Sequence, residues 1–380
     1  MSSKLSIMIV WICFILLLAL GMVMVSSTSV CVEQGDEAYS LLSRQIEFGL
    51  LGFAAAVTLS IVDYRIFRKW ITWIWLFAVG LLICCFLPGI GHEVNGEYRW
   101  VRLGGFQFQP SECAKICMVM TLAHWYAAYK ESASTLLKGF IYPGVLFGVP
   151  LLLIFVEKDM GTAAALAMAG FGVMYVAGSR SWLILLAIGL GALLLWLQTH
   201  SSPNRMIRIE AWKDPALYSL HAGRQQWISI LALARGGMTG VGLGDGIEKH
   251  GSLPFAHTDF IFAEIGEELG IVGTLSVTIL FSVFAFCGIA VALQTTDRFG
   301  RLLAVGIVAT IFWPAMLNIA VVTSLVPNSG LPLPLISCGG TNLVFTMGAV
   351  GILTSIQRHA IPPPETYIIK RRHADGRILP

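Results

Sequence analysis

The chain has 380 residues, of which 56% are hydrophobic and only 12% are charged, about half the charged share, roughly 25%, of a soluble domain. A soluble fold of this length needs more polar residues to cover its surface, so ordinary soluble enzymes and disordered proteins are excluded. The net charge of +3 is too small to indicate nucleic acid or another polyanion as a partner. The mean hydropathy of +0.76 instead predicts an all-α protein that crosses a membrane many times.

Apolar stretches of about twenty residues recur along the whole chain and predict ten membrane-spanning helices. In chain order they cover residues 5–25, 47–63, 71–90, 113–129, 139–156, 161–179, 181–198, 264–292, 301–325 and 341–358. The first stretch also has features of a signal peptide. Its apolar part is longer than usual and no A-x-A motif follows, so we predict a helix there as well.

Lysine and arginine set the predicted orientation, because short cytoplasmic segments of membrane proteins are enriched in them. With the N-terminus inside, the inside segments hold 14 basic residues and the short outside segments hold five. Both termini are therefore predicted to be cytoplasmic.

The outside face carries three long polar segments, 91–112, 199–258 and 326–340. The 60-residue segment 199–258 precedes the eighth helix and is rich in Trp, Leu and Gly, so we expect it to be ordered. We predict one transmembrane domain over residues 1–360 and a cytoplasmic tail over 361–380.

Several kinds of site are not indicated. Eight cysteines are scattered without a CxxC pair, so neither a metal site nor a disulfide is expected. The glycine-dense stretch 236–246 follows no predicted strand, and no Walker A motif is present; no nucleotide is therefore expected, and the glycines indicate a flexible or tightly turned loop.

Acidic residues at the outside ends of the helices are the main candidates for chemistry, because charge near the hydrocarbon is costly. Asp259 enters the eighth helix from the long loop, where a carboxylate could act as a general base or cap the helix. Glu264 and Glu268 lie one turn apart on one face, together with Glu267, and are expected to pair with basic residues of neighbouring helices. His257 has no second ligand at metal spacing.

Two further groups lie at outside helix ends. Asp159 either caps the helix that follows it or takes part in function. Arg102, Glu112 and Lys115 either bind an anionic substrate, since arginine suits phosphate, or pair with one another.

These motifs occur in an order that resembles the SEDS family (shape, elongation, division and sporulation), whose members include FtsW and RodA. The resemblance covers most of the chain. It includes Arg99-Trp100, Gln109-Pro110-Ser111-Glu112 with Ala114-Lys115, Asp159-Met160-Gly161-Thr162, Gln225-Gln226, Gly236-Gly237, Gly240 to Gly244, His257 to Phe262, Gly266 to Gly270, Gly330 to Pro334, Ile336-Ser337 and Gly339-Gly340. The stretches 318–323 and 242–246 are more similar to the division branch, FtsW, than to the elongation branch, RodA.

The resemblance implies a peptidoglycan glycosyltransferase that polymerises lipid II outside the cytoplasmic membrane, with inversion at the donor sugar. It implies that Asp259 is the catalytic base. Arg102 and Lys115 are the candidates for holding the diphosphate, and a divalent cation, Mg or Mn, is another source of positive charge. Glu112, Asp159 and His257 are expected to line the substrate cavity.

The resemblance also implies partners and a location. These are a class B penicillin-binding protein that acts as transpeptidase, other divisome membrane proteins, and the bacterial inner membrane at the division septum. Alternatives are a RodA-like elongation polymerase, a lipid II flippase and a non-catalytic division scaffold. Five positions depart from the family pattern: Lys158 stands for a usual Pro, Cys338 for a Tyr, Thr341-Asn342 for small serines and Glu264 for an apolar residue.

Overall fold

A computed structural model describes residues 3–32, 40–94, 97–103, 106–200, 203–248 and 258–359. Each of the ten apolar stretches is helical in it. The corresponding helices are α1 (Ser3–Val32), α2 (Ser40–Ile61), α4 (Ile71–Cys84), α5 (Pro110–Ala128), α6 (Tyr142–Val156), α7 (Met160–Val176), α8 (Ser181–His200), α11 (Ile261–Gln294), α12 (Arg298–Val322) and α13 (Gly340–His359). Of the described helical stretches, five are long and apolar enough to cross a membrane: Lys4–Ser29, Leu41–Ile61, Leu137–Val156, Ile261–Gln294 and Arg298–Val322.

The all-α prediction is wrong for residues 91–108. Strands β1 (Gly91–Val94), β2 (Glu97–Leu103) and β3 (Phe106–Phe108) form an antiparallel sheet in the order β1-β2-β3. Val101 pairs with Gly91 on one side and with Phe108 on the other. These strands are only three to seven residues long, so their alternation is too short to stand out within a polar segment.

Short helices complete the described chain. They are α3 (Ile66–Lys69), the 3₁₀ turn η2 (Lys130–Ser132), the π-helical turn η3 (Leu137–Ile141), α9 (Pro203–Lys213) and α10 (Arg224–Gly236). The last two lie within the long polar segment, so the prediction that this segment is ordered is confirmed for its described residues.

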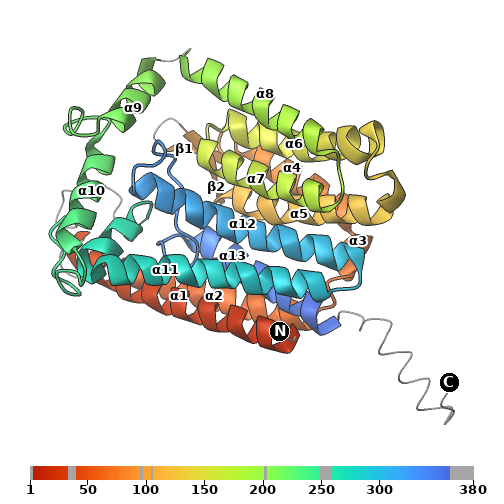
Figure 1. Cartoon of the computed structure of the whole chain (residues 1–380), viewed down its shortest axis with the longest axis horizontal. Coiled ribbons are helices and arrows are strands. Elements are labelled where there is room, and N and C mark those ends of the chain that lie inside the picture. Colours follow the sequence, from red (N-terminus) through yellow and green to blue (C-terminus); the bar gives the residue numbers. More distant parts are fainter. Residues whose placement is uncertain are drawn as a thin grey trace, which may run out of the picture.

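Helix α12 is at the centre of the helical bundle, where it packs against α5, α7, α11 and α13 (Figure 1). Small residues permit this close packing. Gly306 of α12 has no room for a Cβ against Val119 of α5, and Gly288 of α11 has none against Val308.

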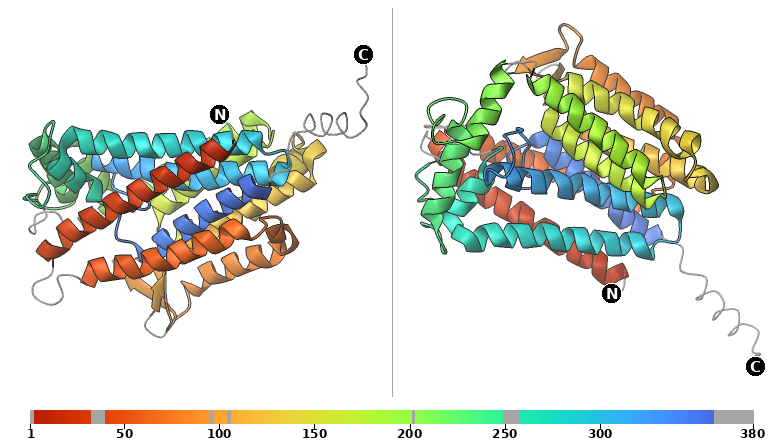
Figure 2. Two further views of the ribbon diagram at one scale, coloured as in Figure 1. Left: turned by 90° about the horizontal axis from the view of Figure 1, so that it is seen from below. Right: turned by 45° about the horizontal axis from the view of Figure 1, so that its top comes forward.

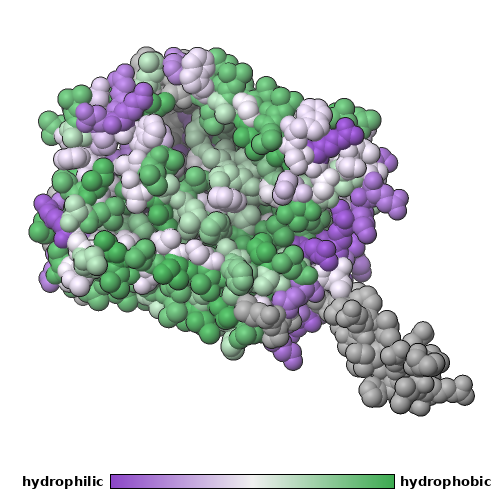
Figure 3. Space-filling view, in the orientation of Figure 1, coloured by the Kyte–Doolittle hydropathy of each residue, from purple (hydrophilic) through white to green (hydrophobic). Residues whose placement is uncertain are grey.

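The bundle has two different ends (Figures 1 and 2). The "loop end" carries the sheet, α9 and α10, and the "terminal end" carries the start of α1, α3 and the end of α13. Apolar residues cover the middle of the face in Figure 3, and hydrophilic residues gather toward both ends. This distribution is the one expected of a protein with an apolar bilayer around its middle.

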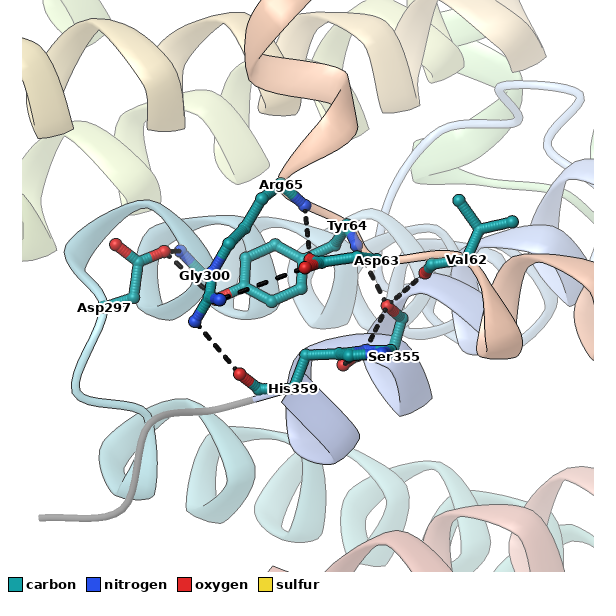
Figure 4. A network of polar contacts seen from close by, with 8 residues as sticks. All are labelled: Val62, Asp63, Tyr64, Arg65, Asp297, Gly300, Ser355 and His359. Atoms are coloured by element: carbon teal, nitrogen blue, oxygen red, sulfur yellow. Dashed lines mark hydrogen bonds and ion pairs between the residues drawn. The ribbon is translucent and has the colours of Figure 1, made fainter.

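A polar network joins the turn after α2 to α12 and α13 at the terminal end (Figure 4). The hydroxyl of Tyr64 donates to Oδ2 of Asp297 at 3.1 Å, and Asp297 is also the N-cap of α12. The backbone N–H of Tyr64 donates to Oγ of Ser355 at 3.1 Å, and Nη2 of Arg65 donates to the carbonyl of His359 at 3.0 Å. The turn after α2 thereby ties α12 and α13 together.

Candidate functional site

Asp259 lies in the turn that leads into α11, and it is partly buried. Helix α11 begins at Ile261 with Phe260 at its N-cap position, so the helix-capping alternative for Asp259 is wrong. Nδ2 of Asn318, on α12, donates to the carbonyl oxygens of Asp259 (2.7 Å) and Leu331 (2.6 Å). One buried amide thus fixes the Asp259 turn against the segment that joins α12 to α13.

Side chains, rather than regular structure, hold the segment between α12 and α13. Oγ of Ser337 donates to the carbonyl of Thr258 at 2.5 Å and accepts from the N–H of Leu333 at 2.8 Å. Gly330 has φ +65° and donates its N–H to Oδ1 of Asn328 at 3.1 Å. These contacts bring Gly330 to the turn that carries the acid.

Gly330 lies between a cation and a carboxylate. A Cβ placed on Gly330 would be 3.5 Å from Nη1 of Arg99 and 3.6 Å from Oδ2 of Asp259. Arg99 and Asp259 therefore flank the same space at the Gly330 backbone, where glycine places no side chain of its own. A base and a cation that flank one space are what a proton transfer coupled to the departure of an anion requires.

The alternation of β2 decides which arginine reaches this space. Successive side chains of a strand point to opposite faces, so Arg99 shares a face with buried Val101 and Arg102 lies on the other. Arg102 is exposed. The structure therefore brings Arg99, and not the predicted Arg102, to Asp259. Strand alternation could have separated the two arginines, had the strand been recognised.

Asp159 both caps a helix and contacts Arg99. Its Oδ1 accepts the N–H of Thr162 at 3.1 Å, which is the N-cap bond of α7. Its Oδ2 accepts from Nε2 of Gln109 at 3.0 Å and lies 3.9 Å from Nε of Arg99. The preceding residue, Lys158, has φ +68°, which a proline fixed near about −65° cannot adopt.

Glu112 and Lys115 pair with each other inside the bundle. Nζ of Lys115 lies 2.9 Å from Oε1 and 2.8 Å from Oε2 of Glu112, one turn earlier on α5. Asn342 of α13 donates to the same Oε2 at 3.0 Å. Glu112 is 3% exposed and Lys115 5% exposed. The pairing alternative is therefore confirmed for these two residues, and Arg102 is not part of the pair.

The carboxylates at the start of α11 are buried under the loop that follows α10. Glu268 accepts Oγ–H of Ser27 at 2.7 Å and the N–H of Gly244 at 3.1 Å. Glu267 accepts two N–H groups of the same loop, at 3.1 and 3.2 Å. Nη1 of Arg235, on α10, lies 3.8 Å from Glu267, whereas the pairing predicted for Glu264 and Glu268 with basic residues stays a prediction.

Little room is left for a side chain at Gly246, where these acids converge. A Cβ on Gly246 would lie 3.0 Å from an oxygen of Glu268, 3.2 Å from one of Glu264 and 3.3 Å from one of Glu267. The family departure at Glu264 therefore adds a third carboxylate to a crowded site rather than a group beside Arg99.

A break in α11 explains the glycine-dense loop. At Gly270 the backbone has φ 66° and ψ −160°, outside helical values. The N–H of Val241 donates to the carbonyl of Glu267 at 3.0 Å, and the N–H of Ile271 donates to the carbonyl of Gly237 at 2.9 Å. The loop after α10 thus pairs with backbone groups on both sides of the break. Of the two interpretations of this loop, the tightly turned one is confirmed.

The described residues hold no group of three or more His, Cys, Asp or Glu side chains that could bind a metal ion. His257, a predicted site residue, lies outside the described residues. Seven cysteines of the described part are free, at positions 13, 84, 85, 113, 117, 287 and 338.

Comparison with known proteins decides the family. The family model for FtsW, RodA and SpoVE, described as cell cycle protein, matches residues 7–361. The chain belongs to this family. It is 38% identical over 339 residues to a probable peptidoglycan glycosyltransferase FtsW of Geobacter sulfurreducens (strain DL-1 / KN400), covering 88% of this chain and 91% of the relative. It is 34% identical over 351 residues to the stage V sporulation protein E of Bacillus subtilis, covering 91% and 95%.

Solved structures show the same FtsW/RodA/SpoVE fold. A chain of a peptidoglycan synthase complex, studied for its coordination of polymerization and crosslinking, matches with a TM-score of 0.73 and 26% identity, covering 91% of this chain and 96% of that one. The rod shape determining protein RodA of Thermus thermophilus matches with a TM-score of 0.68 and 24% identity, covering 93% and 97%.

Proposed function

We propose that the chain is a peptidoglycan glycosyltransferase of the FtsW branch, which polymerises lipid II during cell division. The observation that carries the proposal is the approach of the Asp259 carboxylate and the Arg99 guanidinium to the same backbone position, Gly330. The family relatives named FtsW glycosyltransferases, which are similar over most of both chains, support the same activity.

Asp259 is the base in this mechanism. It accepts the proton of the GlcNAc 4-hydroxyl of lipid II, and the oxygen then attacks the anomeric carbon of the donor sugar. The bond from that carbon to undecaprenyl diphosphate breaks, and its electron pair leaves with the diphosphate. Attack from the opposite face turns the α-linkage of the donor into a β-linkage, as in inverting glycosidases.

Arg99 provides positive charge for the departing diphosphate, which is already a good leaving group and needs no protein acid. Asp159, which accepts a hydrogen bond from Gln109, lies 3.9 Å from Nε of this arginine on the α7 side. The buried Glu112–Lys115 pair acts by fixing α5 against α13. Arg102, on the exposed face of the sheet, is left as a more distant contact for the substrate.

A divalent cation has no evident protein cage among the described residues, because no cluster of three ligating side chains occurs there. The mechanism above therefore assigns its steps to protein side chains alone. A requirement for Mg or Mn stays a prediction, to be tested by chelation in the polymerisation assay.

The proposal includes ten membrane crossings with both termini in the cytoplasm, in one domain over residues 1–360 with a tail over 361–380. The loop end then faces outward from the inner membrane, at the division septum. A class B penicillin-binding protein is the proposed partner, in keeping with the polymerization and crosslinking attributed to the similar synthase complex. Other divisome membrane proteins are proposed to join them.

A flippase must open to both faces of the membrane. At the terminal end, Tyr64 ties Asp297 and Ser355 together (Figure 4), whereas the acid Asp259 lies in the turn before α11 at the loop end. This asymmetry favours an enzyme that works at one face.

The test is polymerisation of lipid II by purified protein together with its cognate transpeptidase. We expect Asp259→Asn to abolish polymer while retaining wild-type yield and melting temperature. Asp214→Asn makes the same chemical change at an exposed position in the segment between α9 and α10 and should leave the rate unchanged. Polymer formation by Asp259→Asn would refute the base assignment. Inactivity of the wild type with its partner present would favour the scaffold alternative.

A further inference from the structure

Glu157 is a further buried carboxyl group that interacts with Arg99, and the mechanism above does not use it. Glu157 is the C-cap residue of α6, two positions before Asp159, and it is 0% exposed. In the part of the chain that the structure describes, neither of its carboxyl oxygens has a nitrogen or oxygen hydrogen-bond donor, and the side-chain group that interacts with it as a donor is the Cys85 thiol. A buried carboxylate without such partners is costly, so the charge on this group must depend strongly on its neighbours.

The neighbours of Glu157 come from three elements. Cys85 follows α4, Asp159 precedes α7, and Arg99 belongs to β2. Burial, and then the Asp159 carboxylate, raise the pKa of Glu157 to about 8, while Cys85 and Arg99 act in the opposite direction. Lys158, beside Glu157 in sequence, has an exposed side chain.

Arg99 connects this group to the proposed base. Its Nε lies 3.9 Å from Oδ2 of Asp159, and its Nη1 lies at Gly330, which the Asp259 carboxylate also approaches. One guanidinium therefore stands between two acids. A negative charge on Glu157, two residues from Asp159, adds to the attraction of the guanidinium toward the turn between α6 and α7 and away from Asp259.

We propose that Glu157 is a positioning residue: as a neutral acid it leaves Arg99 reaching toward Asp259 and the substrate diphosphate, and as a carboxylate it draws Arg99 back to the turn between α6 and α7. This inference rests on the proposed function. Ionisation moves a single proton from Glu157 to solvent and makes or breaks no other bond. The result is a site that loses its cation at alkaline pH.

The test is the pH profile of lipid II polymerisation. We expect the wild-type kcat/KM to fall on the alkaline side of a pKa of about 8, to about a tenth of its plateau one pH unit above it. Glu157→Gln, which cannot ionise, should show no such fall relative to its own plateau. Glu131→Gln makes the same change at an exposed position in the turn after α5, and its profile should match that of the wild type.

An alkaline fall of equal size in Glu157→Gln, or none in the wild type, would overturn the proposal. Infrared difference titration of the wild type provides a measurement that needs no folded Glu157 variant. The band of a buried protonated carboxyl should disappear with a pKa of about 8, together with a shift of the guanidinium band assigned through Arg99→Lys. A carboxyl that titrates without a guanidinium shift would also contradict the proposal.

The two proposals fail in distinguishable ways. If Asp259→Asn still makes polymer, the base assignment is wrong whatever the pH profile of Glu157→Gln. If Asp259→Asn is inactive but the infrared titration shows neither change, only the positioning role is wrong.

Discussion

Replacing Lys115 by methionine should destabilise the protein far more than an ordinary charge substitution. Both oxygens of Glu112 lie within 2.9 Å of the Lys115 ammonium, and both residues are buried. Removing the ammonium leaves a buried carboxylate with Asn342 on one oxygen only. Breaking a buried ion pair from one side costs about 3–5 kcal/mol. At roughly 2 °C per kcal/mol for a chain of this size, the melting temperature should fall by roughly 6–10 °C.

The double variant Glu112→Gln with Lys115→Met tests the cause of this loss. It removes both charges and keeps an amide that can bond Asn342, so the cost should shrink to about 1–2 kcal/mol. Melting in detergent can be followed by size-exclusion chromatography after heating. Lys130→Met, at an exposed lysine after α5, is the control and should stay within about 0.5 kcal/mol of the wild type.

A double variant as unstable as the single one would refute the argument from an unpaired buried charge. The same proteins separate structure from substrate binding. If the double variant melts normally but makes no polymer per folded molecule, the pair contacts the substrate directly.

Three further predictions concern the loop end and the terminal end. Glu268→Ala, which frees Oγ of Ser27 and the N–H of Gly244, should lower the folded yield more than the polymerisation rate per folded molecule; normal yield with lost turnover would make Glu268 catalytic. Gly270→Ala should cost at least about 1–3 kcal/mol in thermal melts, because its backbone conformation is suited to glycine; an unchanged melting temperature would contradict the break seen in α11. Tyr64→Phe should cost about 1 kcal/mol through the lost bond to Asp297. Burial, then the negative charge of Asp297, raise the pKa of Tyr64 to about 12. The contribution of this hydroxyl to folding stability is therefore complete below the unfolded pKa of about 10 and is lost as pH rises through 12. Tyr64→Phe should lack this dependence in melts recorded at different pH.

The apolar stretches already predicted where the long helices lie, because a helix that faces lipid needs a continuous run of apolar residues whatever its neighbours are. All ten stretches are helical. The start of α11 at Ile261, directly after Asp259, also agrees with a carboxylate at a helix entrance. Ordered motifs along the chain were sufficient to identify the family before any contact was known.

Tertiary structure was needed to choose among the charged groups. Arg99 and Arg102 are three residues apart, and only a strand in this place puts the first beside Asp259 and the second on the exposed face. The sheet itself was not predicted, because its strands are short and each is stabilised by hydrogen bonds to a neighbouring strand rather than by contacts within its own residues.

The chain sequence by itself determined that the protein is built from apolar helices and that its few acids gather at helix ends, since both follow from local composition. The position and partners of each acid depend on contacts between residues far apart in the chain, such as Asn318 with the carbonyl of Asp259 or Asn342 with the carboxylate of Glu112. A buried charge takes its properties from the groups that surround it in space, so the surroundings of Asp159, Glu112 and Glu157 were decided only by the packed fold.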